Sequence, residues 1–230
     1  MIRRKDYYKA SPHRNASKIY VICEGSVSEI NYFNFFEGLS TNLKIIPIPP
    51  VNNATDPLKL LKQAEDMFYG DDGRYTLDYS QRDQVWFAID TDTWEKEDKI
   101  EPLRKFCLEK NQKLTKDFDE IKPYNAWQVA QCNPSFEIWL YYHLYDNIPD
   151  EEDVKERDTF KKFVNEKFPG GFNFQTHPVW LEDAIYNAEK NFSCDENGNI
   201  TLFSTEKYLL GKEIIPYVKR ELDKLKNKLQ

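Results

Sequence analysis

The segment KIYVICEGSVSEINYFNFF, residues 18–36, decides the expected fold of this chain. Its apolar run, Ile19 to Cys23, is too continuous for a strand with one face in water, and it is typical of a strand buried in a parallel sheet. The run ends abruptly in an acid, Glu24, followed by Gly25. We therefore expect a buried strand that carries a carboxylate at its carboxyl end.

A second apolar run, VWFAIDTD at residues 85–92, ends in two acids. Side chains alternate along a strand, so Asp90 and Asp92 point the same way, about 7 Å apart, while Thr91 points away. Parallel strands of an open α/β sheet end at one edge, where such folds place their ligands. The pattern predicts that Glu24, Asp90 and Asp92 meet there, although an Asx turn or a helix cap also explains an aspartate at either position.

Three carboxylates without histidine or cysteine form an all-oxygen donor set. Such a set suits Mg²⁺ or Mn²⁺ and does not suit zinc. Magnesium held by carboxylates is the usual apparatus of phosphoryl and phosphodiester chemistry. The leading hypothesis from the residues is a metal-dependent enzyme that acts on phosphodiesters.

Three blocks in this order, VICEGSVSEINYF, VWFAIDTD and CNPSFEIWLYYHL, resemble a known family. A strand ending in Glu-Gly and a later strand ending in Asp-x-Asp are similar to the TOPRIM domain of topoisomerases, primases and related nucleases. Within that group, the sequence of these three blocks resembles the RloB-like proteins of prokaryotic phage-defence and abortive-infection loci. The resemblance covers roughly residues 18–145, and the tail matches less distinctly.

The resemblance implies a TOPRIM-like Rossmannoid α/β fold: a parallel sheet with helices on both faces and a small helical C-terminal addition. It implies a Mg²⁺-dependent nuclease of antiviral defence, sometimes found beside a partner ATPase. Glu24, Asp90 and Asp92 would hold the metal, and a water activated there would attack the phosphodiester.

Glu29 and Glu137 are further candidates to assist the chemistry. Ser26 to Glu29 fits a capping box, so Glu29 is interpreted both as a helix cap and as an added metal ligand of the kind found in related TOPRIM nucleases. Glu137 falls in the first turn of a helix expected after Asn133 and Pro134, where an acid complements the helix dipole. The resemblance to RloB favours a second role for Glu137, facing the carboxylates.

The chain of 230 residues suits one compact unit with an appended subdomain. We expect a basic N-terminal arm at residues 1–17, a TOPRIM-like domain at 18–146, and a mostly helical extension at 147–230 packed on it. The arm carries several cations, which either contact phosphates or simply remain in solvent.

A formal charge of −7 and a pI near 5.2 argue against a general nucleic-acid coat protein and do not exclude a nuclease. Four cysteines without a C-x-x-C pair indicate neither a zinc site nor a disulfide framework. No stretch is apolar enough to span a bilayer or to serve as a signal peptide, so we expect a cytoplasmic protein.

Several functions stay open at this stage. The same acids serve strand transfer or nucleotidyl transfer, and a non-catalytic or partner-activated regulatory subunit also fits. The sequence leaves undecided whether RNA, tRNA or DNA is the substrate, how many ions bind, and whether the chain forms a homo-oligomer. His143, between two large side chains of a predicted helix, is interpreted as structural rather than catalytic.

The remaining pattern predicts scaffold. Leu43 to Ile48, rich in proline, is expected as an edge strand. A helix follows Asp56 and ends at Gly70, with Leu58, Leu61 and Ala64 on its apolar stripe. Further elements are expected at residues 95–114 (helix), 125–132 (strand), 136–145 (helix), 181–192 (helix) and 213–230 (helix).

Overall fold

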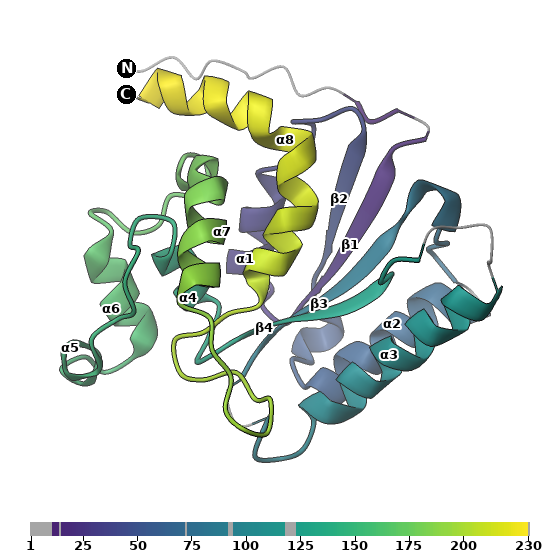
Figure 1. The fold of residues 1–230 in the computed structure, drawn as a ribbon, viewed down its shortest axis with the longest axis horizontal. Helices are drawn as coiled ribbons and strands as arrows, with labels where there is room; N and C mark the ends of the chain where they lie inside the picture. Colours follow the sequence, from purple (N-terminus) through teal and green to yellow (C-terminus); the bar gives the residue numbers. More distant parts are fainter. Residues whose placement is uncertain (1–10, 14, 72, 92–93, 118–122, 230) are drawn as a thin grey trace.

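A parallel β-sheet forms the centre of the computed structural model, which describes residues 11–13, 15–71, 73–91, 94–117 and 123–229 (Figure 1). In this part of the chain the sheet has four strands in the order β2-β1-β3-β4. Their bounds are β1 Ser17–Cys23, β2 Leu43–Ile48, β3 Gln84–Asp90 and β4 Trp127–Cys132. All three pairings are parallel, which confirms the predicted parallel sheet with the 43–48 strand at its edge.

Helices cover both faces of the sheet, and this explains why β1 and β3 are apolar on both sides. On one face, α2 (Pro57–Tyr69) and α3 (Ile100–Asp117) pack side by side (Figure 1). The opposite face carries α1 (Ser28–Asn34), α4 (Glu137–Tyr141), α7 (Leu181–Lys190) and α8 (Lys207–Leu229). The expected α/β, Rossmann-like architecture is confirmed.

The order of the connections creates a topological switch point at the edge of the sheet, which is where ligands bind in such folds. From β1 the chain passes through α1 to β2, toward one edge of the sheet. From β3 it passes through α3, on the other face, to β4 at the opposite edge. The carboxyl ends of β1 and β3 therefore flank the topological switch point.

Several predicted helix bounds are wrong. The helix expected from Glu95 begins at Ile100, because a turn with Asp98 at φ 53 occupies residues 94–98. The last helix begins at Lys207 instead of residue 213, so it is one turn and a half longer. Pro216 lies inside it, and Figure 1 shows the helix bending along its length, as an internal proline favours.

Local details around two other helices also differ from expectation. In α2 the buried residues are Pro57, Leu60, Gln63 and Ala64, whereas Leu58 is 39% exposed. Before α4, Asn133 does not act as the cap. Its side chain instead donates a hydrogen bond to the carbonyl of Ile200, and Phe136 is the N-cap residue.

The C-terminal helices share the core of the sheet. Leu210 and Ile214 of α8 belong to the same buried cluster as Val21 of β1 and Trp139 of α4. Where α8 meets α7, a Cβ atom at Gly211 would lie 2.7 Å from Cγ1 of Ile185. Close approach of the two helices therefore requires a glycine at this position.

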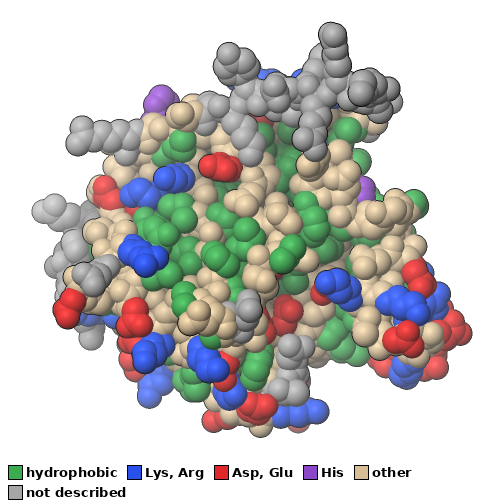
Figure 2. Space-filling view, turned by 180° about the vertical axis from the view of Figure 1, so that it is seen from behind, with side chains coloured by type: hydrophobic (Ala, Val, Ile, Leu, Met, Phe, Trp, Pro, Cys, Tyr) green, Lys and Arg blue, Asp and Glu red, His purple; other side chains and the backbone are tan. Residues whose placement is uncertain are grey.

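The smaller helices form a lobe beside this core, made by α5 (Glu151–Lys155) and α6 (Phe160–Lys167). At the right of Figure 2 this lobe carries basic and acidic side chains side by side, and Arg157 and Lys162 form ion pairs with acids there. Such a mixed surface lacks the single sign of charge that binds a phosphate backbone. Single 3₁₀ turns lie at Val51–Asn53, Tyr79–Gln81 and His177–Trp180. None of the described helices is long and apolar enough to cross a lipid bilayer.

Candidate functional site

Glu24 and Asp90 meet at the switch point between β1 and β3. Glu24 follows the last residue of β1, and its backbone N–H donates to the carbonyl of Ala88 at 2.9 Å, which extends the pairing of the two strands. Its Oε2 atom accepts a 2.8 Å hydrogen bond from the backbone N–H of Asp90, the last residue of β3. The sheet register alone brings these two acids together.

The turn after β3 covers Glu24. Trp94 donates from its indole Nε1 to Glu24 Oε1 at 3.0 Å. The ammonium group of Lys99 lies 4.7 Å from the centre of the Trp94 ring and forms a 2.6 Å ion pair with Asp56 at the start of α2. Both carboxylate oxygens of Glu24 are thus held by hydrogen bonds, and Trp94 is a contact that sequence reasoning missed.

Glu29 is buried and turns back toward the end of β1. Its Oε2 atom accepts a 2.6 Å hydrogen bond from the backbone N–H of Gly25. A Cβ atom at position 25 would lie 3.1 Å from this oxygen, so a glycine there allows the close approach. The predicted capping box is wrong, because the N-cap residue is Val27 and no side chain caps the helix. The hydrogen bond from Gly25, and not a helix cap, fixes the position of the Glu29 carboxylate.

Two carboxylate oxygens of this site are buried without a hydrogen-bond partner among the described residues: Glu29 Oε1 and Asp90 Oδ1. Burial raises the pKa of Glu29 to about 7, although Lys207 and the Gly25 N–H act in the opposite direction. Burial, followed by the charges of Glu29 and Glu24, raises the pKa of Asp90 well above its usual value. Perturbed acids grouped at a sheet edge are typical of functional sites.

Lys207, the first residue of α8, places a cation among these acids. Its side chain is 1% exposed, and Nζ lies 3.7 Å from Glu29 Oε1. The ammonium group also donates a 2.7 Å hydrogen bond to the carbonyl of Ala130 in β4. Sequence reasoning missed Lys207 because the predicted helix began six residues later.

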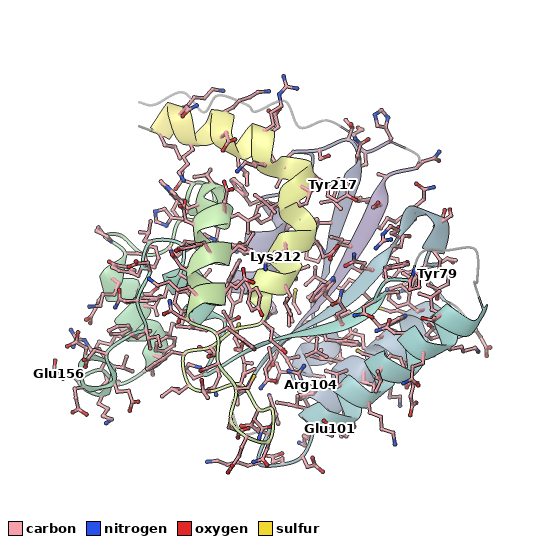
Figure 3. The ribbon with its side chains drawn as sticks, in the orientation of Figure 1. Tyr79, Glu101, Arg104, Glu156, Lys212 and Tyr217 are labelled. Carbon is pink, nitrogen blue, oxygen red and sulfur yellow. The ribbon has the colours of Figure 1, made fainter. Side chains whose placement is uncertain are left out.

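A polar network fixes the start of α8 against the sheet. Arg104 of α3 donates to both carboxylate oxygens of Glu206, at 3.1 and 2.7 Å, and to the side chain of Gln131. Gln131 in turn donates to the Thr91 hydroxyl at 2.9 Å, and this hydroxyl donates to the carbonyl of Cys132 in β4. Figure 3 shows Arg104 at the end of α3 nearest the carboxyl ends of the strands. The network therefore holds residue 206, and with it Lys207, at the site.

Glu137 lies at the border of the cluster. It is in the first turn of α4, as predicted, and accepts a 2.7 Å hydrogen bond from the Ser135 hydroxyl. Lys161 of α6 lies 3.8 Å from its other oxygen. Its charge is near enough to contribute to the raised pKa of Asp90. Glu137 is thus near the site, and its carboxylate forms an ion pair with Lys161.

Asp92, the third predicted metal ligand, lies outside the described residues, as does most of the predicted basic arm. Within the described part, no group of three or more acidic, histidine or cysteine side chains has an arrangement that holds a metal ion. The donor chemistry nevertheless fits a small hard cation. Glu29 Oε1 and Asp90 Oδ1 are buried oxygens without hydrogen bonds, and oxygen is the donor that Mg²⁺ and Mn²⁺ prefer.

Comparison with known proteins adds one relationship. A family model described as RloB-like protein matches residues 19–214, a range that contains the acids of the site and Lys207. No curated protein and no solved structure matches the chain significantly.

Proposed function

The chain belongs to the RloB-like family, and from this premise we propose that it is a metal-dependent nuclease that cleaves nucleic-acid phosphodiester bonds in prokaryotic antiviral defence. The nuclease activity, the metal and the TOPRIM character of the domain are all parts of this proposal. One observation carries it: Glu24, Glu29 and Asp90 meet at the switch point of the sheet, with two buried oxygens that accept no hydrogen bond from the described residues.

In this proposal Glu24, Asp90 and Asp92 hold Mg²⁺ or Mn²⁺, and Glu29 and Glu137 assist. When bound, such an ion supplies positive charge to phosphate oxygens and lowers the pKa of a water molecule. The protein's own contribution is positional. The Gly25 N–H orients Glu29, and the Asp90 N–H orients Glu24, so both carboxylates have fixed positions before any ligand arrives.

Cleavage of labelled RNA and DNA, with and without Mg²⁺ or Mn²⁺, tests the proposal. The wild-type chain is expected to cleave only with the metal. Asp90→Asn and Asp90→Ala are expected to lose this cleavage while keeping the circular dichroism spectrum of the wild type. Asp158→Asn, which changes an exposed aspartate in the α5–α6 lobe, is the matched control and is expected to retain activity. Full cleavage by both Asp90 variants would refute the assignment.

A second candidate is a partner-activated subunit, which itself cleaves little or nothing until an ATPase binds. The observation that favours it is the state of Glu24, whose two oxygens accept hydrogen bonds from the Asp90 N–H and the Trp94 indole. Each of these oxygens keeps a second lone pair for a metal ion, but a carboxylate freed from the Trp94 donor would offer more of its charge to that ion. Binding of a partner near the turn at residues 94–98 is one way to release it.

Two comparisons separate the candidates. An autonomous nuclease cleaves when only the metal is added, whereas a partner-activated subunit is inert until the ATPase is supplied. Trp94→Phe removes the indole donor and keeps the ring. It is expected to raise metal-stimulated cleavage by the isolated chain if release of Glu24 is limiting, and to leave cleavage unchanged if it is not.

A further inference from the structure

Lys161 of α6 holds an exposed ammonium group at the border of the proposed site. Its side chain is 64% exposed, and its Nζ atom lies 3.8 Å from Oε1 of Glu137. This distance joins an ion pair but is too long for a hydrogen bond. The ammonium group donates no hydrogen bond to any residue in the described part of the chain. Its three N–H donors are therefore available to a ligand.

The register of the sheet places the start of α4, and with it this ammonium group, beside the site. Cys132, the last residue of β4, is the register partner of Asp90, and α4 begins shortly after it, at Glu137. The ring centre of Phe136, the preceding residue, lies 5.8 Å from the Nζ atom of Lys207. A cation next to Glu137 is therefore at the edge of the proposed site.

Core contacts of α6 hold Lys161 in this place. Phe163 and Val164 of the same helix are each 1% exposed. The ring of Phe160, the residue before Lys161, stacks on the ring of Phe203 with 5.4 Å between their centres. The lysine thus extends from a packed helix, which is the kind of support that positions a contact to substrate.

The two cations described above at this site already donate to the protein. The Lys207 ammonium group is buried and donates to the carbonyl of Ala130. The Lys99 ammonium group donates to the carboxylate of Asp56 at 2.6 Å. Of these three described lysines, Lys161 is the one that combines an exposed side chain with unused donors.

The neighbouring cations of the α5–α6 lobe pair within the lobe. Three of them each donate to a lobe acid: Lys155 to Glu152, Arg157 to Glu166 and Lys162 to Asp158. Lys161 differs from them, because its acid partner belongs to α4. The mixed surface of the lobe is therefore balanced locally, whereas the charge of Lys161 lies toward the site.

A nucleic acid and this chain carry the same sign of charge. The formal charge of the chain is −7 at pH 7. Contacts from lysine and arginine to phosphates supply much of the affinity of proteins for nucleic acids. An acidic protein therefore needs individual cations placed where the strand passes. An exposed ion pair stabilises a protein little, so Lys161 exchanges Glu137 for a phosphate at small cost.

We propose that Lys161 is a substrate-binding residue, whose ammonium group donates hydrogen bonds to a backbone phosphate of the nucleic acid beside the site of cleavage. This inference rests on the proposed function, because it concerns the substrate of the same site. Phosphate is common to RNA and DNA, so the contact holds the strand without reading its bases.

The first test measures binding without cleavage. Fluorescence anisotropy follows a labelled single-stranded RNA and a labelled DNA duplex, in EDTA and in Ca²⁺, at several salt concentrations. Lys161→Met is expected to weaken binding roughly threefold to tenfold and to make the slope of log K against log salt shallower by about one. Lys161→Arg keeps the charge and is expected to keep the wild-type slope.

Lys162→Met is the matched control for this test. Lys162 is the next residue of the same helix, is 54% exposed and pairs with Asp158, so the variant loses the same charge at a neighbouring position. It is expected to keep the affinity and the salt slope of the wild type. Equal weakening by Lys161→Met and Lys162→Met would overturn the inference, because it would reflect net charge and not a contact at the site.

The second test measures cleavage with Mg²⁺ or Mn²⁺. Lys161→Met is expected to raise KM and to change kcat little, because a contact far from the reacting bond binds substrate and transition state alike. Wild-type KM, affinity and salt slope in Lys161→Met protein with the circular dichroism spectrum of the wild type would overturn the inference.

Failure of the proposed function has a different signature. A chain that binds nucleic acid through Lys161 but cleaves none with either metal loses the proposed nuclease activity and keeps this contact. A chain that cleaves, and binds equally well without Lys161, refutes this inference and leaves the nuclease proposal standing. A wild-type chain that binds neither RNA nor DNA refutes both.

Discussion

Asp90 combines the position that we propose for metal binding with a local cost in stability. Burial and the neighbouring Glu29 and Glu24 raise its pKa, so its ionised form is disfavoured in the folded chain relative to the unfolded chain. An acid with a raised pKa destabilises the fold at high pH, and this penalty disappears as the pH falls and the acid is protonated. Such a loss of stability is expected at a position where an acid is needed to bind a cation and not to stabilise the fold.

Asp90→Asn is therefore expected to raise the melting temperature without divalent ions at pH 8, by roughly a few degrees. The gain is expected to shrink toward acidic pH, because the wild-type carboxyl becomes neutral there. Thermal unfolding in EDTA, followed by circular dichroism at several pH values, measures this difference. Asp158→Asn serves as the exposed control, and a lower melting temperature for Asp90→Asn at pH 8 would contradict the electrostatic interpretation.

Burial also shifts the pKa of His143, a residue with a structural role, and so makes the stability of the fold depend on pH. It is 1% exposed, with Nε2 lying 3.1 Å from the Tyr32 hydroxyl and Nδ1 3.0 Å from the Trp139 carbonyl oxygen. Burial lowers its pKa to about 3. The imidazole is thus neutral in the folded chain at pH values where the unfolded chain already binds a proton.

This shift predicts a loss of stability in mild acid. Because the folded pKa lies below the unfolded value near 6.5, the contribution is present above that value and is lost as the pH falls. Between pH 7 and pH 5 the loss from this residue is roughly 2 kcal/mol. Urea unfolding of the wild type and His143→Gln at both pH values isolates it, since other groups titrate alike in both proteins. Equal pH dependence in the two proteins would show that His143 does not contribute.

At the scale of elements, the strands were easier to predict than the helix ends. Continuous apolar runs predicted β1 and β3, and the proline-rich run predicted β2 at the edge. The predicted start of a helix was wrong where a turn precedes the helix or where its first residue contacts a residue far away in sequence. The positive φ of Asp98 (53°) belongs to a turn, so α3 begins after it. At the start of α8, the Lys207 ammonium group donates to the carbonyl of Ala130, which lies 77 positions earlier in the sequence.

The contact of α7 with α8 predicts a strong effect for a small substitution. Gly211→Ala gains helix propensity, but the added methyl would meet Ile185 at 2.7 Å, and overpacking of this kind costs about 1–3 kcal/mol. A lower free energy of unfolding in urea is the expected result. Ile185→Ala makes room for the methyl, so the double variant is expected to lose less than the two single losses combined. Simple additivity would show that the two side chains do not clash.

At the scale of the whole molecule, one core joins the two parts of the chain that the sequence pattern separates. Val21 and Trp86 of the sheet share a buried cluster with Leu181 of α7 and Val218 of α8. Residues after 146 therefore cover one face of the sheet that carries Glu24 and Asp90. A chain without them would expose that face to water.

A chain of residues 1–146 is accordingly expected not to reach a stable fold, whereas the full chain is expected to unfold in one cooperative transition. Near-ultraviolet circular dichroism and binding of the dye ANS distinguish these states, since a loosely packed chain loses the first signal and binds the dye. Cooperative unfolding of the 1–146 chain, with fixed aromatic signals, would show that the two parts fold independently.

The sequence by itself determined the parallel α/β sheet and the acids at its switch point, because strand patterns and the residues that follow them are local. Only the tertiary structure decided that Glu29 contacts the Gly25 N–H, that Trp94 donates to Glu24, and that Lys207 is buried beside these acids. Trp94 and Lys207 reach the site across long sequence separations, and no periodicity encodes such pairs. Burial in a shared core brings them together, and burial also raises the pKa of Glu29 and of Asp90 at the same site.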